Sequence, residues 1–280
     1  MRVYAMVADR PEHLAYYSQA GPIVSDRLIV RSVKVYADGA LGSRGALLLA
    51  PYKDVDTVWH GLQLGTAEHF NEVADWCLRH GFQMATHCIG DSANRLLLDI
   101  YGAHLESGND LRWRIEHAQV VSPADLSKFK EKNVLPSVQP THAVSDRAWA
   151  EERLGAERIG HAYAYEQLRQ QTGLIPLGTD FPVEAIDPLG TFYAAVLRTT
   201  GDGQDSGNLH MENALSREHA LAGITMHNAI ATFTEQDLGS LEVNKRADLV
   251  ILDRDILTVG PKALLRTRVL ATFVDGERVH

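Results

Sequence analysis

The sequence has few cysteines and no long hydrophobic segment. Cys77 and Cys88 are the only two cysteines among 280 residues, which is too few for a disulfide framework and typical of a reducing compartment. No apolar run is long enough to span a bilayer, and the opening stretch MRVYAMVADR lacks the layout of a signal peptide. We therefore predict a cytoplasmic protein that does not bind membranes.

Basic clusters and phosphate-binding glycine loops are also absent. The formal net charge is −9, and no block of Lys and Arg or stripe of basic and aromatic residues occurs. This charge disfavours nucleic acid and anionic lipid as partners. No GxGxxG or P-loop pattern is present, so nothing indicates a nucleotide site. The chain has 280 residues, of which 45% are hydrophobic. This length and composition suit one large domain, alone or with a small appendage.

Strand-like and helix-like patterns alternate along most of the chain. Thr66 and Gly81 have the residue types that begin and end a helix, and Asp91 and Ser216 are expected to cap two further helices. Such alternation predicts a parallel sheet with right-handed crossovers. An open doubly wound sheet and a (β/α) barrel both satisfy it. The predicted strands are residues 2–7, 32–38, 82–87, 112–117, 134–139 and 174–180.

The position of the polar residues favours the barrel. Several lie at or just past the C-terminal end of a different predicted strand, where barrel enzymes assemble their sites: Lys34, His87, His117, His142 and Asp180. From Gly239 the pattern changes to strands, with Asp275-Gly276 as a hairpin turn. We predict an incomplete TIM-like (β/α) barrel of about six units over residues 1–235 and a small β-sandwich portion over residues 236–280.

Histidines and carboxylates at one end of such a barrel suit a divalent metal such as zinc. Each residue alone has a simpler explanation. A histidine such as His87 is usually a core residue, Asp180 could cap a turn, and Lys34 could extend to the rim of the sheet. Because Lys34, His87, His117 and Asp180 occur at the same end of four strands, we predict a metal site.

Six stretches, in the same order, resemble the amidohydrolase superfamily, and most closely its YtcJ-like amidohydrolase-3 branch. They are VKVYADGALGSR, THCIGDSAN, RIEHAQ, SVQPTHAVSD, GTDFPVE and GSLEVNKRADLVILDRD. The resemblance implies a TIM-like barrel with one or two metal ions and a β-sandwich formed from both chain ends. It also implies metal-dependent hydrolysis of a non-peptide C–N bond, in an amide or cyclic amide of low molecular weight.

The resemblance assigns roles to individual residues. Lys34 would be carboxylated to a carbamate that bridges two metals, and His87 and His117 would be metal ligands. Asp180 would contact metal and act as the proton shuttle. It would take a proton from the metal-bound water and deliver it to the leaving nitrogen. The residues expected to face substrate are Gln139, His142 and Asp146.

One signature of the superfamily is missing. Its first barrel strand carries His-x-His, and this sequence has no His-x-His. If Lys34 lies on strand 4, then residues 2–7 form strand 3, and strands 1 and 2 are absent. We therefore expect exposed sheet edges at 2–7 and 174–180 and a homo-oligomer. Two functions stay open: a metal-dependent amidohydrolase, and a non-catalytic remnant or binding scaffold without a complete metal site.

Overall fold

The computed structural model describes residues 1–199 and 210–280. These residues form two compact units. The first contains residues 1–138 and 149–173, and the second contains residues 139–148 and 174–280. This division does not test the predicted boundary at residue 236 between a barrel and a β portion, which stays a prediction.

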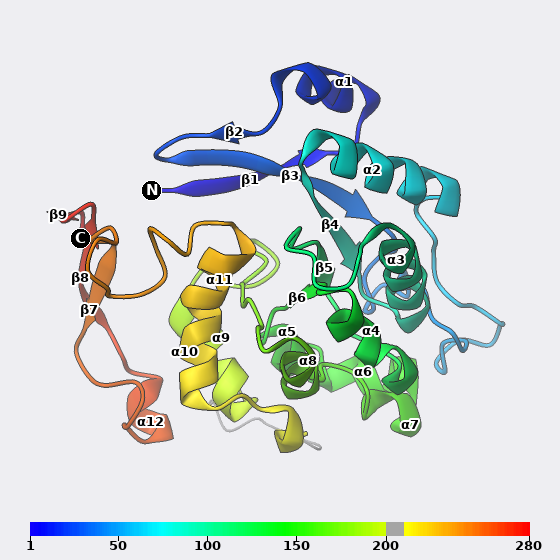
Figure 1. Cartoon of the computed structure of the whole chain (residues 1–280). Coiled ribbons are helices and arrows are strands. Elements are labelled where there is room, and N and C mark those ends of the chain that lie inside the picture. The colour runs from blue at the N-terminus through cyan, green and yellow to red at the C-terminus, as the bar shows by residue number, and fades with distance from the viewer. Residues whose placement is uncertain (200–209) are drawn as a thin grey trace. The chain divides into compact units, whose positions relative to one another are not determined.

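A parallel sheet is the centre of the first unit (Figure 1). Its strand order is β1-β3-β4-β5-β6, every neighbouring pair is parallel, and a short β2 pairs antiparallel with β3. The five parallel strands coincide with five of the six predicted strands, which confirms the α/β class. The bounds are β1 Val3–Ala8, β2 Ile23–Val24, β3 Leu28–Tyr36, β4 Gln83–Cys88, β5 Arg114–His117 and β6 Leu135–Ser137.

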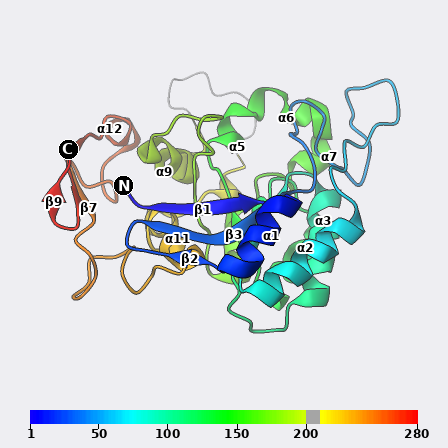
Figure 2. The same cartoon turned by 90° about the horizontal axis from the view of Figure 1, so that it is seen from above.

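Helices follow the strands of this sheet. Two of them, α2 and α3, pack against each other and against β4, and Figure 2 shows them side by side. The helices are α1 Pro11–Ala20, α2 Ala67–His80, α3 Asp91–His104, η1 Pro123–Asp125, α4 Leu126–Glu131, α6 Arg147–Leu154, α7 Ala156–Ile159 and α8 Tyr165–Thr172, and the first two residues of α6 belong to the second unit.

Helix α2 begins and ends where the sequence indicates. The Thr66 side chain accepts a hydrogen bond from the His69 amide at 3.2 Å, and Gly81 ends the helix in the left-handed conformation, with φ of 72°. Its apolar face, which includes Phe70 and Cys77, is buried. Both predicted helix ends are confirmed.

Helix α3 begins differently from the prediction. Gly90, and not Asp91, is its N-cap residue, and Asp91 is the first helical residue. The Asp91 carboxylate accepts the Leu49 amide at 2.8 Å, while the first amides of α3, on Ser92 and Ala93, donate to the Leu47 carbonyl. The helix start is therefore capped by a distant loop, which local sequence does not reveal.

The second unit contains short helices and an antiparallel sheet of order β7-β8-β9. Asp275 and Gly276, with φ of 53° and 79°, form the turn between β8 and β9, as predicted for an Asp-Gly hairpin. The elements are α5 His142–Ser145, α9 Pro188–Leu197, η2 Met211–Asn213, α10 Arg217–Ile224, α11 Met226–Ala231, β7 Leu249–Leu252, α12 Pro261–Leu264, β8 Val269–Val274 and β9 Glu277–Arg278.

The sixth predicted strand, residues 174–180, does not form a strand. Pro176 has no amide to donate to a strand ladder. The flanking amides are directed to helices instead: Ile175 donates to Nδ1 of His227, and Leu177 donates to the Gly223 carbonyl. The prediction of six strands was therefore wrong in this segment, and the parallel sheet is open. Among the described residues, no helix has the length and apolarity to cross a membrane.

Gly90 tests how tightly the loop is held on α3. A Cβ at Gly90 would lie 2.0 Å from the Leu47 carbonyl oxygen, whereas a Cβ at Gly81 would meet nothing within 4 Å. We expect Gly90→Ala to lower the free energy of unfolding by about 3 kcal/mol or more through overpacking. Gly81→Ala should cost only about 1–2 kcal/mol, from its left-handed backbone. Urea denaturation measures both, and equal costs would contradict the clash.

Candidate functional site

Three of the predicted metal ligands lie on adjacent parallel strands of the first unit. Lys34 is on β3, His87 on β4 and His117 on β5. The strand register sets Tyr36 opposite His87 and Cys88 opposite His117, so the C-terminal ends of these strands coincide. Parallel pairing therefore brings the two histidines to the same edge of the sheet. Lys34 is two residues before Tyr36, the residue of β3 that lies opposite His87.

The two imidazole rings are in contact. The ring centroids of His87 and His117 are 4.5 Å apart in an edge-to-face arrangement. Tyr36 lies beside them, with its ring centroid 5.4 Å from that of His87, and the Lys34 ammonium is 4.8 Å from the Tyr36 ring. The structure thus gathers these side chains, although their role as ligands stays a prediction.

A positive φ explains how His117 reaches His87. In the register, Glu116 and not His117 is opposite His87, so regular strand alternation would direct His117 to the other face. His117 instead has φ of 75°, and the next residue, Ala118, has φ of 40°. Rotation about the N–Cα bond of His117 changes the direction of its Cβ. Such backbone conformations are costly for residues other than glycine and often occur at functional sites.

Burial determines the charge state of His87. Its pKa is lowered to about 4, chiefly because burial disfavours the charged ring, and also because Lys34 is close. The ring is therefore neutral at neutral pH, and a neutral imidazole is the form that binds metals. Its Nε2 is buried without a hydrogen-bond partner and lies 3.5 Å from Oδ1 of Asp38.

A buried ion pair lies below the histidines. Arg114 donates to Glu116 at 2.7 Å, and both side chains are buried on β5. Burial alone would raise the pKa of Glu116, but the charges of Arg114 and Lys34 hold it below its usual value. Sequence reasoning assigned no role to this pair, because alternating charges on a four-residue strand do not by themselves show burial.

The described residues fit a metal only in part. No group of three His, Cys, Asp or Glu side chains in residues 1–199 and 210–280 is arranged to hold a metal ion. The donor set at the strand ends is the two imidazoles of His87 and His117. Zinc sites in proteins use at least three protein ligands, so the set is complete in this unit only if Lys34 carries a carbamate.

The remaining predicted residues belong to the second unit. His142 begins α5, its Nε2 is 3.9 Å from Oδ2 of Asp180, and Asp180 has a positive φ of 56°. The Gln139 carbonyl accepts the His142 amide at 3.1 Å, and the Asp146 amide donates to the His142 carbonyl at 3.0 Å. The predicted proton shuttle and one predicted substrate residue therefore face each other, and backbone hydrogen bonds within the segment 139–146 hold His142.

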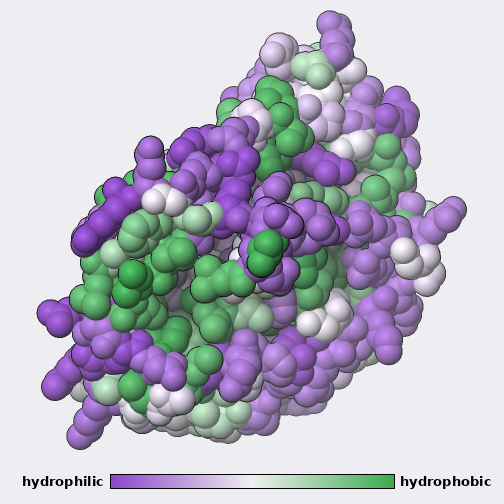
Figure 3. Space-filling model, turned by 60° about the vertical axis from the view of Figure 1, so that its left-hand side comes forward, coloured by the Kyte–Doolittle hydropathy of each residue, from purple (hydrophilic) through white to green (hydrophobic). Residues whose placement is uncertain are grey.

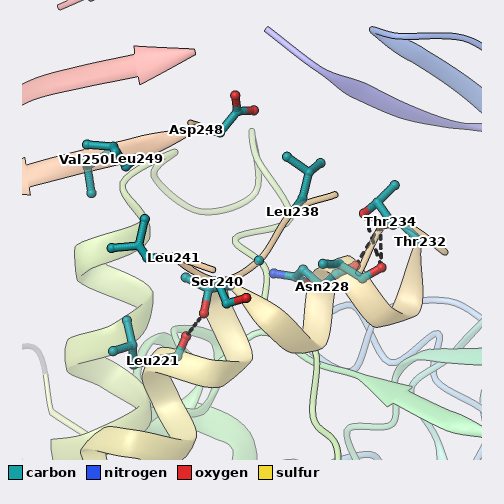
Figure 4. A pocket seen from close by; sticks show the side chains of 13 residues that line it. Leu221, Asn228, Thr232, Thr234, Leu238, Ser240, Leu241, Asp248, Leu249 and Val250 are labelled. Carbon is teal, nitrogen blue, oxygen red and sulfur yellow. Dashed lines mark hydrogen bonds between the residues drawn. The ribbon is translucent and has the colours of Figure 1, made fainter. Parts of the chain in front are cut away.

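A separate pocket of about 810 Å³ lies in the second unit, between α10, α11 and β7 (Figure 4). Leu221, Leu249 and Val250 give it apolar walls, and Asn228 lies at its polar side. None of the predicted site residues lines it. The pocket therefore contributes nothing to the predicted metal chemistry.

Comparisons with known proteins agree with the arrangement of the motifs. The sequence profile of the amidohydrolase family matches residues 3–280. The protein LONG AFTER FAR-RED 3 of Arabidopsis thaliana is 34% identical over 94% of this chain and 45% of its own length. The putative amidohydrolase YtcJ of Bacillus subtilis is 30% identical over 99% of this chain and 51% of its own.

A crystal structure of an uncharacterized metal-dependent hydrolase from Pyrococcus furiosus is also similar. It has a TM-score of 0.80 and 35% sequence identity, over 92% of this chain and 52% of that protein. The chain thus spans about half the length of the relatives that it matches. Because the family profile extends over nearly the whole sequence, the chain belongs to the amidohydrolase family.

Proposed function

We propose that this chain is the metal-binding part of a hydrolase that cleaves a non-peptide C–N bond in a small amide or cyclic amide. The observation that carries the proposal is the contact of His87 and His117, 4.5 Å apart, at the ends of strands adjacent to the one that holds Lys34. Membership in the amidohydrolase family and similarity to a metal-dependent hydrolase support it.

The ligands in this proposal are Lys34, as a carbamate, His87 and His117, and the metal is zinc. A carbamate converts the lysine from a cation, which repels a metal, into an anionic oxygen ligand. When bound, a divalent metal supplies Lewis-acid activation of water and of the scissile carbonyl. The neutral state of His87 supports its part in the set, because no proton has to leave the ring at neutral pH.

Asp180 moves the proton in this proposal. Its carboxylate accepts the proton of the attacking water and then donates it to the leaving nitrogen. His142, 3.9 Å away, restrains the carboxylate, and together with Gln139 and Asp146 it contacts substrate. Two free, buried cysteines, Cys77 and Cys88, support a reducing compartment such as the cytoplasm.

Self-association is a further part of the proposal. β1 is at the edge of the parallel sheet, and its Val3 and Met6 side chains are 39% and 41% exposed. An edge strand with exposed apolar side chains favours pairing with another chain. Figure 3 shows several hydrophobic patches on one face of the molecule.

Zinc loading tests the metal site. After loading and removal of free metal, the chain should retain about one equivalent by elemental analysis, and His87→Ala less than about a tenth, because two protein ligands rarely retain zinc. His13→Ala removes a half-buried histidine outside the proposed ligand set and should leave the stoichiometry unchanged. Equal zinc in all three proteins would remove His87 from the set, and no zinc in any would favour a non-catalytic scaffold.

Replacement of the shuttle tests the chemistry. In the active enzyme, Asp180→Asn should lower kcat about 10²–10⁴-fold and leave KM nearly unchanged, since the amide keeps the shape but cannot accept a proton. Glu184→Gln alters a half-buried carboxylate of the same loop that accepts a hydrogen bond from Ser145 at 2.6 Å. It should keep kcat, because the amide oxygen can still accept that bond. Steady-state kinetics at matched metal content measures both, and near-normal kcat in Asp180→Asn would remove Asp180 from the mechanism.

Charge at the sheet edge tests self-association. The double substitution Val3→Lys and Met6→Lys should shift the chain to monomer in light scattering, because charged side chains on an edge strand oppose pairing. Val58→Lys introduces one such charge at an 81% exposed position outside any strand and should not shift the chain to monomer. A monomeric unsubstituted chain would contradict the proposed association.

A further inference from the structure

Two large apolar side chains are exposed in the turn that begins at Asp180. The Val183 amide donates to the Asp180 carbonyl at 2.8 Å. This hydrogen bond closes a four-residue turn, in which the first and last Cα atoms lie within about 7 Å of each other. Within the turn, Phe181 is 60% exposed and Val183 is 70% exposed. Apolar surface is therefore open to solvent next to the residue whose carboxylate faces His142.

The charged side chains of the same loop are engaged within the second unit. Residues 181–187 contain two ionisable groups, the carboxylates of Glu184 and Asp187. Glu184 accepts the Ser145 hydroxyl at 2.6 Å, which joins the loop to α5. Asp187 accepts the Leu189 amide at 2.9 Å at the start of α9. The surface that the turn offers to a ligand is therefore apolar and uncharged.

We propose that Phe181 and Val183 bind an apolar substituent on the leaving nitrogen, so that the substrate is an amide whose nitrogen carries an alkyl or aryl group. This inference rests on the proposed function, in which Asp180 donates a proton to that nitrogen. The nitrogen must then lie within about 3 Å of the carboxylate, and its substituent reaches the side chains of the same turn. An apolar substituent removes their surface from water, whereas a polar one loses its own hydration.

Binding without catalysis tests the inference in the chain alone. N-hexylacetamide and N-methylacetamide differ only in the length of the group on nitrogen, and saturation-transfer NMR measures both affinities. We expect N-hexylacetamide to bind at least about 10-fold more tightly, because each fully buried methylene strengthens binding about fourfold. The hexyl protons should receive more saturation than the acetyl protons. Equal affinities would overturn the inference, and so would no detectable binding of N-hexylacetamide.

A matched pair of variants shows whether the turn is the binding surface. The double substitution Phe181→Ser and Val183→Ser should weaken N-hexylacetamide binding about 10-fold. Ile186→Ser removes an apolar side chain of similar exposure, 69%, that lies outside the turn, and should keep the affinity. Thermal unfolding checks that both variants fold. Equal losses in the two variants would overturn the inference. If the double variant does not fold, the preference of the unsubstituted chain still decides.

Two isomeric amides separate this inference from the proposed function in the active enzyme. N-hexylacetamide and N-methylheptanamide have the same atoms, but the long chain is on the nitrogen in the first and on the carbonyl carbon in the second. The double variant should lower kcat/KM for N-hexylacetamide about 10-fold, and for N-methylheptanamide by less. Asp180→Asn should lower kcat for both isomers by the same factor, because both need the proton.

The two failures are distinguishable. Equal losses for the two isomers in the double variant would overturn the assignment of the turn to the nitrogen substituent and leave the proposed function intact. Near-normal kcat in Asp180→Asn would count against the proposed function, and with it the placement of the leaving nitrogen beside this turn. A change of oligomeric state in the double variant, with unchanged affinity for N-hexylacetamide, would assign the turn to contacts between copies and overturn the inference.

Discussion

The parallel pairing of β3, β4 and β5 is the constraint on which the candidate site depends. Side chains from three segments far apart in sequence meet because parallel strands in this register end at the same edge of the sheet. A shift of one residue would direct His87 to the opposite face, since side chains alternate along a strand. The buried cores of α2 and α3, packed on β4, hold that register.

Burial shifts the pKa values of two side chains at the candidate site. A buried imidazole is stable in its neutral form, and a buried carboxylate is costly unless it is hydrogen-bonded. His87 and Asp38 show both effects, because burial lowers the pKa of the histidine to about 4 and raises that of the carboxylate to about 7. Three backbone amides partly oppose the shift at Asp38. A cation at the strand ends would compensate the negative charge of Asp38 and of the nearby Glu116.

Much of the α/β pattern could be predicted because strand alternation and helix caps are local signals. Thr66 and Gly81 define α2 by their own chemistry. The prediction failed where distant contacts decide: Asp91 accepts an amide from a loop, and residues 174–180 direct their amides to helices. Asp38 was part of a recognised motif but was given no role, because its three amide partners lie on segments that only folding brings together. The positive φ of His117 also has no sequence signal.

The position of a bound metal tests the central claim most directly. Crystals of the chain loaded with zinc, with diffraction data collected on both sides of the zinc absorption edge, locate the ion without reference to activity. The account predicts an anomalous peak at the C-terminal ends of β3, β4 and β5, bonded to His87, His117 and a carboxylated Lys34. A fully occupied zinc ion held by other residues, with these three side chains unligated, would contradict it.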